Sequence, residues 1–272
     1  MNSSTKQVIA VAGCKGGVGK TLVSVNLALA LARKGRKVVL VDGNLDVPDV
    51  GVTLGLEKDL DMNAPETGRL EAYDHGLLKH GPSGVNVLTP GGKPIWRESI
   101  NIGQAVAMID SLEPLAPSLD TLILDTSPGL APDNITLIQA AGEILIVVNQ
   151  EVVSLLDALR LIRVLYRIYG VQKFGIIVNA VSNRRSGAQQ FEKLQAQLKD
   201  EVEIVLRFLG TIPFDKTVAE SLKEQKALLE HNPDCRASKA ILRIAQQLYS
   251  MPVTPPRGRI EFFLPTRIKE RV

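Results

Sequence analysis

The sequence predicts an α/β fold in which one doubly wound, mostly parallel sheet is flanked by helices. Short apolar runs alternate with helical patterns along the 272 residues, which is the order typical of βαβ units. The first apolar run leads through a glycine-rich turn into a helix, and several later runs end in an acid or an amide. The sequence contains no internal repeat and no long linker. We therefore expect one domain over residues 1–250, followed by a proline-rich tail over residues 251–272.

Each element is predicted from its local pattern. Short apolar runs bounded by turn residues predict strands over residues 8–12, 37–41, 85–88, 121–124, 144–148, 174–178 and 205–212. Apolar residues at helical spacing predict helices over residues 21–34, 102–112, 134–141, 155–169, 188–199, 218–225 and 237–249. Three prolines interrupt the stretch 43–84, which is predicted to be mostly loop, and residues 90–94 are predicted to form a turn.

Composition limits the classes of function. Hydrophobic residues make up 45% of the chain, which is ample for a core, and the net charge is only +3. This charge does not indicate an obligate nucleic-acid binder, and 4% aromatic residues do not favour a base-stacking surface. Two cysteines without metal-ligand spacing indicate a reducing cytoplasm. The polar start and the short apolar runs predict neither a signal peptide nor a membrane span.

A phosphate-binding motif follows the first predicted strand. Gly19, Lys20 and Thr21 fit the end of the pattern G-x-x-x-x-G-K-[ST], while Cys14 stands where the pattern has its first glycine. Glycines let backbone N–H groups approach phosphate oxygens, and the helix beginning near Lys20 adds its dipole. We expect Lys20 to reach the β- and γ-phosphates and the Thr21 hydroxyl to hold Mg²⁺. The alternative is an ordinary glycine-rich turn, which does not require all these features in this order.

Polar residues end several of the predicted strands, and we expect them at the same sheet edge as the phosphate loop. They are Asp42, Asp125, Asn179 and the loop at 213–215. Asp125 suits the Walker-B role of holding Mg²⁺ through a water, although a turn or a helix cap is the alternative for any single strand-end acid. Gly129, four residues further on, is expected to offer its N–H to the γ-phosphate.

The loop carries a second lysine, Lys15, so that two lysines surround one phosphate site. This two-lysine loop resembles the deviant Walker A motif of the MinD/ParA ATPases. The resemblance extends over residues 7–250, through Asp42, the segment 125–129, Asn179 and the segment 211–215. Within that family the chain most resembles the flagellar-number regulators FlhG and FleN, in segments 25–31, 50–56, 210–215 and 256–263.

The resemblance implies an ATPase switch. ATP would close two subunits into a homodimer in which each Lys15 reaches the partner's phosphates, and hydrolysis would dissolve the dimer. The implied catalytic residues are Lys15, Lys20, Asp42, Asn44 and Asp125, and the implied magnesium ligands are Thr21, Asp42 and Asp125. The implied ATP-binding positions are Gly16, Gly17, Val18, Gly19, Lys20, Thr21, Leu22 and Gly129, with Asn179, Pro213 and Asp215 around the adenine.

The chain departs from the family pattern at four positions. Asn44 stands where relatives have an acid that orients or deprotonates the attacking water, and an amide cannot take the proton. Asp46, two residues on, is a weak substitute. Asp49 replaces a usual asparagine, and Leu22 replaces a usual polar residue. Cys14 replaces a common glycine, where a small packed residue is favoured over a redox role. Two hypotheses stay open: a slow ATPase with a long-lived dimer, and an ATP-binding scaffold that hardly hydrolyses.

Partners are less well specified by the sequence. The tail mixes bulky apolar and basic residues, which suits either a peripheral contact with the inner face of the cell membrane or docking on its own domain. A DNA-partition role would use arginines at 160, 163, 167, 184 and 185, for which ordinary surface charge is the alternative. The flagellar branch implies a signal-recognition-type GTPase, a switch-complex protein or a transcription regulator. No cysteines are placed for an iron–sulfur cluster.

Overall fold

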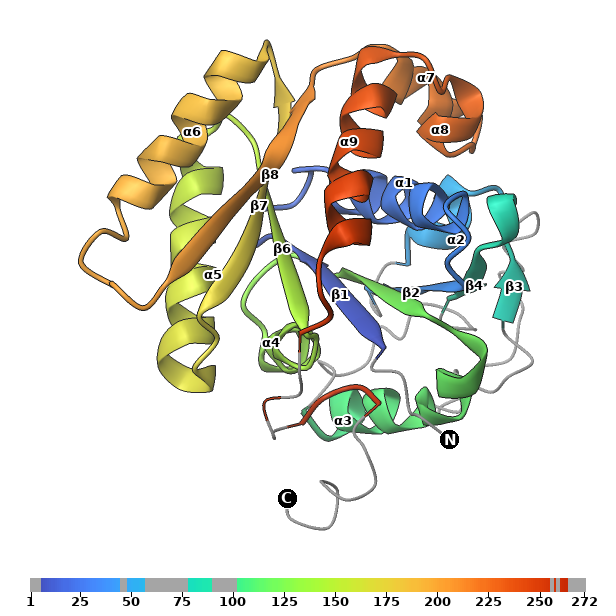
Figure 1. Cartoon of the computed structure of the whole chain (residues 1–272), viewed down its shortest axis with the longest axis horizontal. Coiled ribbons are helices and arrows are strands. Elements are labelled where there is room, and N and C mark those ends of the chain that lie inside the picture. Colours follow the sequence, from blue (N-terminus) through green and yellow to red (C-terminus); the bar gives the residue numbers. More distant parts are fainter. Residues whose placement is uncertain are drawn as a thin grey trace.

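A sheet of parallel strands forms the centre of the molecule (Figure 1). The computed structural model describes residues 6–44, 48–56, 78–89, 102–254, 257 and 260–263. The strands are β1 (Gln7–Ala12), β2 (Val38–Gly43), β3 (Leu78–His80), β4 (Asn86–Leu88), β5 (Thr121–Thr126), β6 (Glu143–Val148), β7 (Lys173–Val181) and β8 (Val205–Pro213). Their order in the sheet is β3-β4-β2-β5-β1-β6-β7-β8, and every described pair is parallel except β3 with β4.

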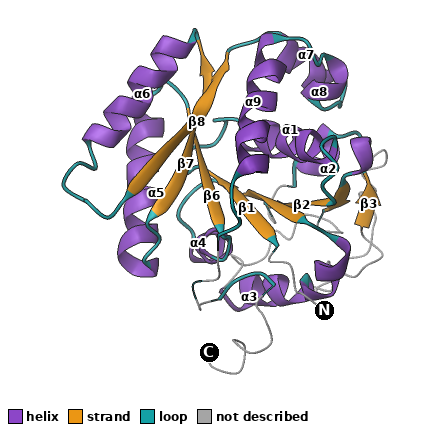
Figure 2. Cartoon of the chain, viewed as in Figure 1, coloured by secondary structure: helices purple, strands orange, loops and turns teal. Residues whose placement is uncertain are grey.

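Helices cover both faces of this sheet (Figure 2). They are α1 (Lys20–Ala32), α2 (Val50–Thr53), α3 (Ile102–Ser111), α4 (Pro132–Gln139), α5 (Val152–Tyr169), α6 (Arg184–Ala196), α7 (Thr217–Lys223), α8 (Leu228–His231) and α9 (Arg236–Ser250). Two short 3₁₀ segments, η3 (Pro82–Gly84) and η4 (Glu113–Ser118), lie between them. The predicted doubly wound, mostly parallel α/β fold is confirmed.

The alternation of side chains along β1 explains the two layers of core. Ile9 and Val11 point into the core that contains α1, α8 and α9, whereas Val8 and Ala10 point into the core that contains α3 and α4. A strand covered on both faces must be apolar throughout, and β1 is buried at every position. Helix α1 is also buried on nearly all sides, because it is packed between the sheet and α9.

The structure differs from the predicted elements where the local pattern is short or exposed. The segment predicted as loop contains α2, and the edge strand β3 pairs antiparallel with β4 through only three residues. Helix α5 begins three residues before the prediction, because its first turn exposes Val152 and Val153 and so lacks an amphipathic signal. Strand β7 continues past Asn179 through a bulge, where Ala180 has a φ of 53°. The predicted turn at 90–94 lies outside the described residues.

The described part of the tail docks on the domain at the edge where β6 begins. Arg257 donates to the carbonyls of Gln139 and Ala141, which closes the C-terminal end of α4. The Phe262 N–H donates to the Ala140 carbonyl at 3.4 Å, and the Phe262 ring is 6% exposed against the α3–α4 core. In this part of the tail, docking on the chain's own domain is what the structure shows. No helix in the described ranges combines the length and apolarity that crossing a membrane requires.

We predict that Phe262→Ala lowers the free energy of unfolding by about 3 kcal/mol, because it opens a cavity in the α3–α4 core. Urea denaturation monitored by circular dichroism measures this change. Ile260→Ala is the matched control, since Ile260 is 37% exposed, and its loss should stay below about 1 kcal/mol. Equal losses in the two variants would show that the ring does not anchor the tail.

Candidate nucleotide-binding site

The phosphate loop joins β1 to α1 at the carboxyl edge of the sheet. Gly17 and Gly19 have φ angles of 76° and 94°, which favour glycine, and α1 begins directly after Gly19. A Cβ added at Gly16 or Gly17 would meet no atom within 4 Å, so open space lies in front of this backbone. Such a surface lets backbone N–H groups come close to phosphate oxygens.

Asn179 of β7 braces the same loop from the neighbouring part of the sheet. Its side chain is 5% exposed and donates from Nδ2 to the Val18 carbonyl at 2.8 Å. A Cβ at Gly19 would lie only 2.2 Å from that nitrogen, so the close approach of the two residues depends on glycine. The structure thus brings together Val18, Gly19 and Asn179, three of the predicted ATP-binding residues.

Asp125 is held by two hydroxyls of α1. Thr21 donates to Oδ2 and Ser24 donates to Oδ1, each at 2.7 Å. Burial raises the pKa of Asp125 to about 6, although these two hydrogen bonds favour the ionised form. The hydrogen bond brings together Thr21 and Asp125, two residues that were each expected to hold Mg²⁺. Ser24 was missed, although its position three residues after Thr21 places it on the same face of the helix.

Asp42 lies beside Asp125, because the two residues pair in register on neighbouring strands. The carboxylate of Asp42 is fully buried and accepts the N–H groups of Asn44 at 3.0 Å and Val50 at 2.9 Å. Burial, followed by the nearby charge of Asp125, raises the pKa of Asp42 to about 8. Two buried carboxyl groups side by side make a cluster of hard oxygen atoms, which suits a divalent cation.

Lys20 provides the positive charge of this cluster. It is 8% exposed, and burial lowers its pKa while Asp125 and Asp49 oppose that shift. Burial raises the pKa of Asp49, and Lys20 opposes it, so Asp49 lies within electrostatic reach of the loop lysine. Asp46, the candidate substitute for the missing acid, lies outside the described residues.

The loop after β5 contacts the end of β2 and the loop that follows it. The Ser127 hydroxyl lies 3.1 Å from Asn44 Oδ1 and 3.3 Å from the Gly43 carbonyl, and it is the donor in both contacts. Gly129 has a φ of 95°, and a Cβ added there would meet no atom within 4 Å. Only the backbone conformation therefore favours glycine at this position. Asn134 of α4, for which the sequence carries no site motif, donates to the carbonyls of Ser127 and Gly129.

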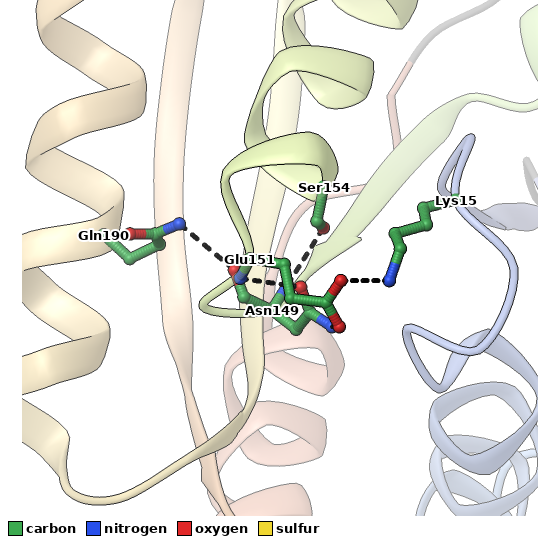
Figure 3. Close-up of polar contacts among 5 residues, drawn as sticks. All are labelled: Lys15, Asn149, Glu151, Ser154 and Gln190. Carbon is green, nitrogen blue, oxygen red and sulfur yellow. Dashed lines mark hydrogen bonds and ion pairs between the residues drawn. The ribbon is translucent and has the colours of Figure 1, made fainter.

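Lys15 forms an ion pair with Glu151 of its own chain (Figure 3). Hydrogen bonds from Lys15 and then Asn149 lower the pKa of Glu151. Asn149 is itself fixed through its backbone by Ser154 and Gln190 (Figure 3). The second loop lysine therefore lies against the loop between β6 and α5. Glu151 was missed because 136 residues separate it from Lys15.

The predicted adenine-binding residues lie at the ends of β7 and β8, where Val181 pairs with Pro213. Asp215 accepts the N–H groups of Thr217 at 3.2 Å and Arg236 at 3.1 Å. Burial alone would raise the pKa of Asp215, but these hydrogen bonds lower it. The carboxylate of Asp215 thus joins the start of α7 to the start of α9, and this role is structural.

Leu22 and Cys14, two departures from the family pattern, both pack against the interior. Leu22 is 9% exposed in the core around α1. Burial, followed by the charge of Asp157, raises the pKa of the Cys14 thiol to about 11. A thiol with this pKa carries almost no reactive thiolate at neutral pH. The favoured reading of Cys14 as a small packed residue agrees with this environment.

The residues present fit ATP with Mg²⁺. Open space faces the glycines, Lys20 lies at the start of α1, and a hydroxyl lies beside a buried carboxylate. Thr21 and Asp125 would hold the cation, which supplies positive charge to the phosphates. Bound phosphate would also bring a counter-charge to Lys20, whose burial is costly without one.

A glycine loop between β1 and α1, with a threonine–aspartate pair beside it, defines the P-loop class of nucleotide-binding proteins. A family model described as "ParA: NUBPL iron-transfer P-loop NTPase" matches residues 4–249, and the chain belongs to this family. Antiactivator FleN of Pseudomonas aeruginosa is 37% identical over 259 residues, which cover 95% of this chain and 92% of FleN. The resemblance to the MinD/ParA ATPases, and within them to FleN, is confirmed.

Two further comparisons agree. An uncharacterized ATP-binding protein of Methanocaldococcus jannaschii is 31% identical over 243 residues, covering 88% of this chain and 86% of its own. The structure of MinD from Pyrococcus horikoshii, solved with Mg-ADP, superposes with a TM-score of 0.68 at 22% identity. That match covers 90% of this chain and 96% of MinD, and it supports the fold.

We predict that Gly19→Ala weakens ATP binding more than tenfold, because the new Cβ would displace Asn179 and distort the loop. Calorimetric titration with Mg-ATP measures the change. Gly35→Ala is the matched control, since Gly35 also has a positive φ, 88°, but its Cβ would meet nothing. Both variants carry backbone strain of about 1–3 kcal/mol, but only Gly19→Ala should lose affinity. Wild-type affinity in Gly19→Ala would contradict the assigned contact.

Proposed function

We propose that this protein is an ATP-dependent dimerising switch of the MinD/ParA type that regulates the number or placement of flagella. The observation that carries the nucleotide part is the Thr21–Asp125 hydrogen bond beside an open glycine loop. The flagellar part is supported by the match to FleN along almost the whole of both chains. The partner would be a signal-recognition-type GTPase, a switch-complex protein or a transcription regulator, and the protein would act in the cytoplasm.

Lys15 is the residue through which a second subunit would sense the nucleotide. In the monomer it pairs with Glu151, and both side chains are partly exposed, so the pair is weakly held. Dimerisation would exchange this carboxylate for the phosphate oxygens of the other subunit. A cation placed there would stabilise the charge that develops during phosphoryl transfer, as an arginine finger does.

Asn44 sets the expected rate of hydrolysis. Its Oδ1 accepts a hydrogen bond from Ser127, and an amide cannot remove a proton from water. Phosphoryl transfer depends mainly on positioning and electrostatics, so slow turnover is the expected result. The alternative is an ATP-bound scaffold without measurable turnover.

We predict that purified protein releases phosphate slowly from ATP, that Lys20→Ala abolishes this activity, and that Asn44→Asp raises it about tenfold. Phosphate release measured at saturating Mg-ATP gives the three rates. Asn183→Asp is the matched control, because Asn183 caps α6 and aspartate caps a helix equally well. If the wild-type rate does not exceed that of Lys20→Ala, the protein is a scaffold and not an ATPase.

We predict that Lys15→Ala binds ATP normally but no longer dimerises with ATP, because the cross-subunit charge is removed. Light scattering with size-exclusion chromatography, in ATP and in ADP, measures the mass. Lys239→Ala controls for the loss of a lysine in a surface ion pair, since Lys239 pairs with Asp234 at 3.3 Å. If dimerisation required Lys15 in ADP as well as in ATP, this result would argue against nucleotide-dependent dimerisation.

Two rival functions find less support. For DNA partition, much of the basic charge on α5 is already paired, Arg160 with Asp157 and both Arg163 and Arg167 with Glu201. For iron–sulfur transfer, the two cysteines of the chain lie in different loops, Cys14 in the phosphate loop and Cys235 just before α9, and clusters are generally held by four cysteines. A salt-sensitive mobility shift of duplex DNA by the ATP-bound protein would support the DNA-partition function.

The proposal includes contact between the tail and the membrane. The docking of the tail on its own domain does not test this contact, so an experiment is needed. Co-sedimentation with anionic liposomes in ATP, compared with a chain ending at Tyr249, measures it. Equal pelleting of the two chains would show that the tail has no such role.

A further inference from the structure

Asn134 holds the loop that follows Asp125. It is the third residue of α4, its side chain is 2% exposed, and it projects both N–H bonds of its amide toward that loop. Nδ2 lies 2.9 Å from the Ser127 carbonyl and 3.1 Å from the Gly129 carbonyl. One side chain therefore fixes two peptide groups that are two residues apart.

The peptide between those two carries the Gly129 N–H. Its orientation has little freedom, because the Pro128 ring restricts φ on one side and the two anchored carbonyls flank it. The φ of Gly129, 95°, completes this bent backbone. Within the described ranges, no acceptor is found for the Gly129 N–H. A fixed, unused donor at the nucleotide edge is suited to a phosphate oxygen.

The same anchor also acts on Asn44, in the loop after β2. Ser127, whose carbonyl Asn134 binds, donates its hydroxyl to Asn44 Oδ1. A displacement of the Asn134 amide would therefore move both Gly129 and the hydroxyl in contact with Asn44. Both groups lie beyond the carboxyl ends of β2 and β5, next to the buried acids.

The Asn134 side chain also lowers the stability of the fold in one respect, and its role in holding the loop explains why an amide is present. Its Oδ1 is buried and finds no partner in the part of the chain that the structure describes. An unsatisfied buried acceptor is destabilising, and an apolar side chain of similar size would avoid it. The retained amide is accounted for by the two donors that the loop carbonyls need.

We propose that Asn134 is a positioning residue that holds the Gly129 N–H ready for the terminal phosphate, so that the protein distinguishes ATP from ADP. This inference rests on the proposed ATP-dependent switch. ADP lacks the group that Gly129 would contact, and the phosphate loop binds the remaining phosphates without Asn134. Loss of the Asn134 amide therefore weakens binding of a nucleotide with three phosphates and spares ADP.

The test replaces Asn134 by leucine, which has nearly the same volume and no polar atoms. Calorimetry measures the dissociation constants of Mg-ADP and of the slowly hydrolysed analogue Mg-AMPPNP, and thermal unfolding reports folding. We expect Asn134→Leu to weaken AMPPNP at least about tenfold and to change ADP less than threefold. A residue needed only for folding would change both ligands together.

Thr136→Val is the control on the same helix. Thr136 is as buried as Asn134, but its hydroxyl donates to Pro132 within α4 and not to the loop. We expect an unchanged ratio of AMPPNP to ADP affinity in this variant. Asn134→Asp is the second variant, used if Asn134→Leu does not fold, because aspartate keeps the shape and offers at most one donor where the amide has two.

The outcomes separate this inference from the proposed function. Wild-type protein that binds neither nucleotide overturns both. Wild-type protein that prefers AMPPNP, with the same preference in Asn134→Leu or Asn134→Asp, overturns the positioning role and leaves the switch intact. Selective loss of AMPPNP in the Asn134 variants, with Thr136→Val unchanged, supports the positioning role.

Discussion

The hydrogen bonds from Thr21 and Ser24 to Asp125 are the contacts on which the rest of the site depends. They join the first turns of α1 to the carboxyl end of β5, and so hold the phosphate loop against the strand beside it. A carboxylate this deeply buried would be unstable as an isolated charge, but two short hydroxyl contacts favour its ionised form. The loop geometry and the proposed cation site therefore depend on the same three side chains.

Around this centre, acids and a lysine are crowded at one sheet edge. Burial raises the pKa of Asp42 to about 8 and lowers the pKa of Lys20, so burial disfavours the charged form of each group. A magnesium ion with phosphate would supply the opposite charges that both groups lack. Ligand binding and folding stability are thus linked at this edge, because only the folded chain assembles the cluster.

The fold and the centre of the site were predictable because their signals are local. The glycine loop is continuous in sequence, and each strand-end residue follows an apolar run, so parallel pairing brings them to one edge. Ser24, Asn134 and Glu151 were missed because their roles depend on partners that only the fold reveals. Ser24 and Asp125, for example, are separated by 101 residues. The short elements α2, α8 and β3 were missed because three or four residues carry no periodicity.

The contact between Gly19 and Asn179 restricts how this sequence can diverge. A methyl group at Gly19 would occupy the place of the Asn179 amide, and that amide supports the Val18 carbonyl. A side chain could be accommodated at position 19 only after the residue at 179 had become smaller, and the loop would then lose its brace. Each residue thus makes substitution of the other unfavourable. Such mutual constraint tends to keep two positions fixed together over long periods, although 160 places separate them in the chain.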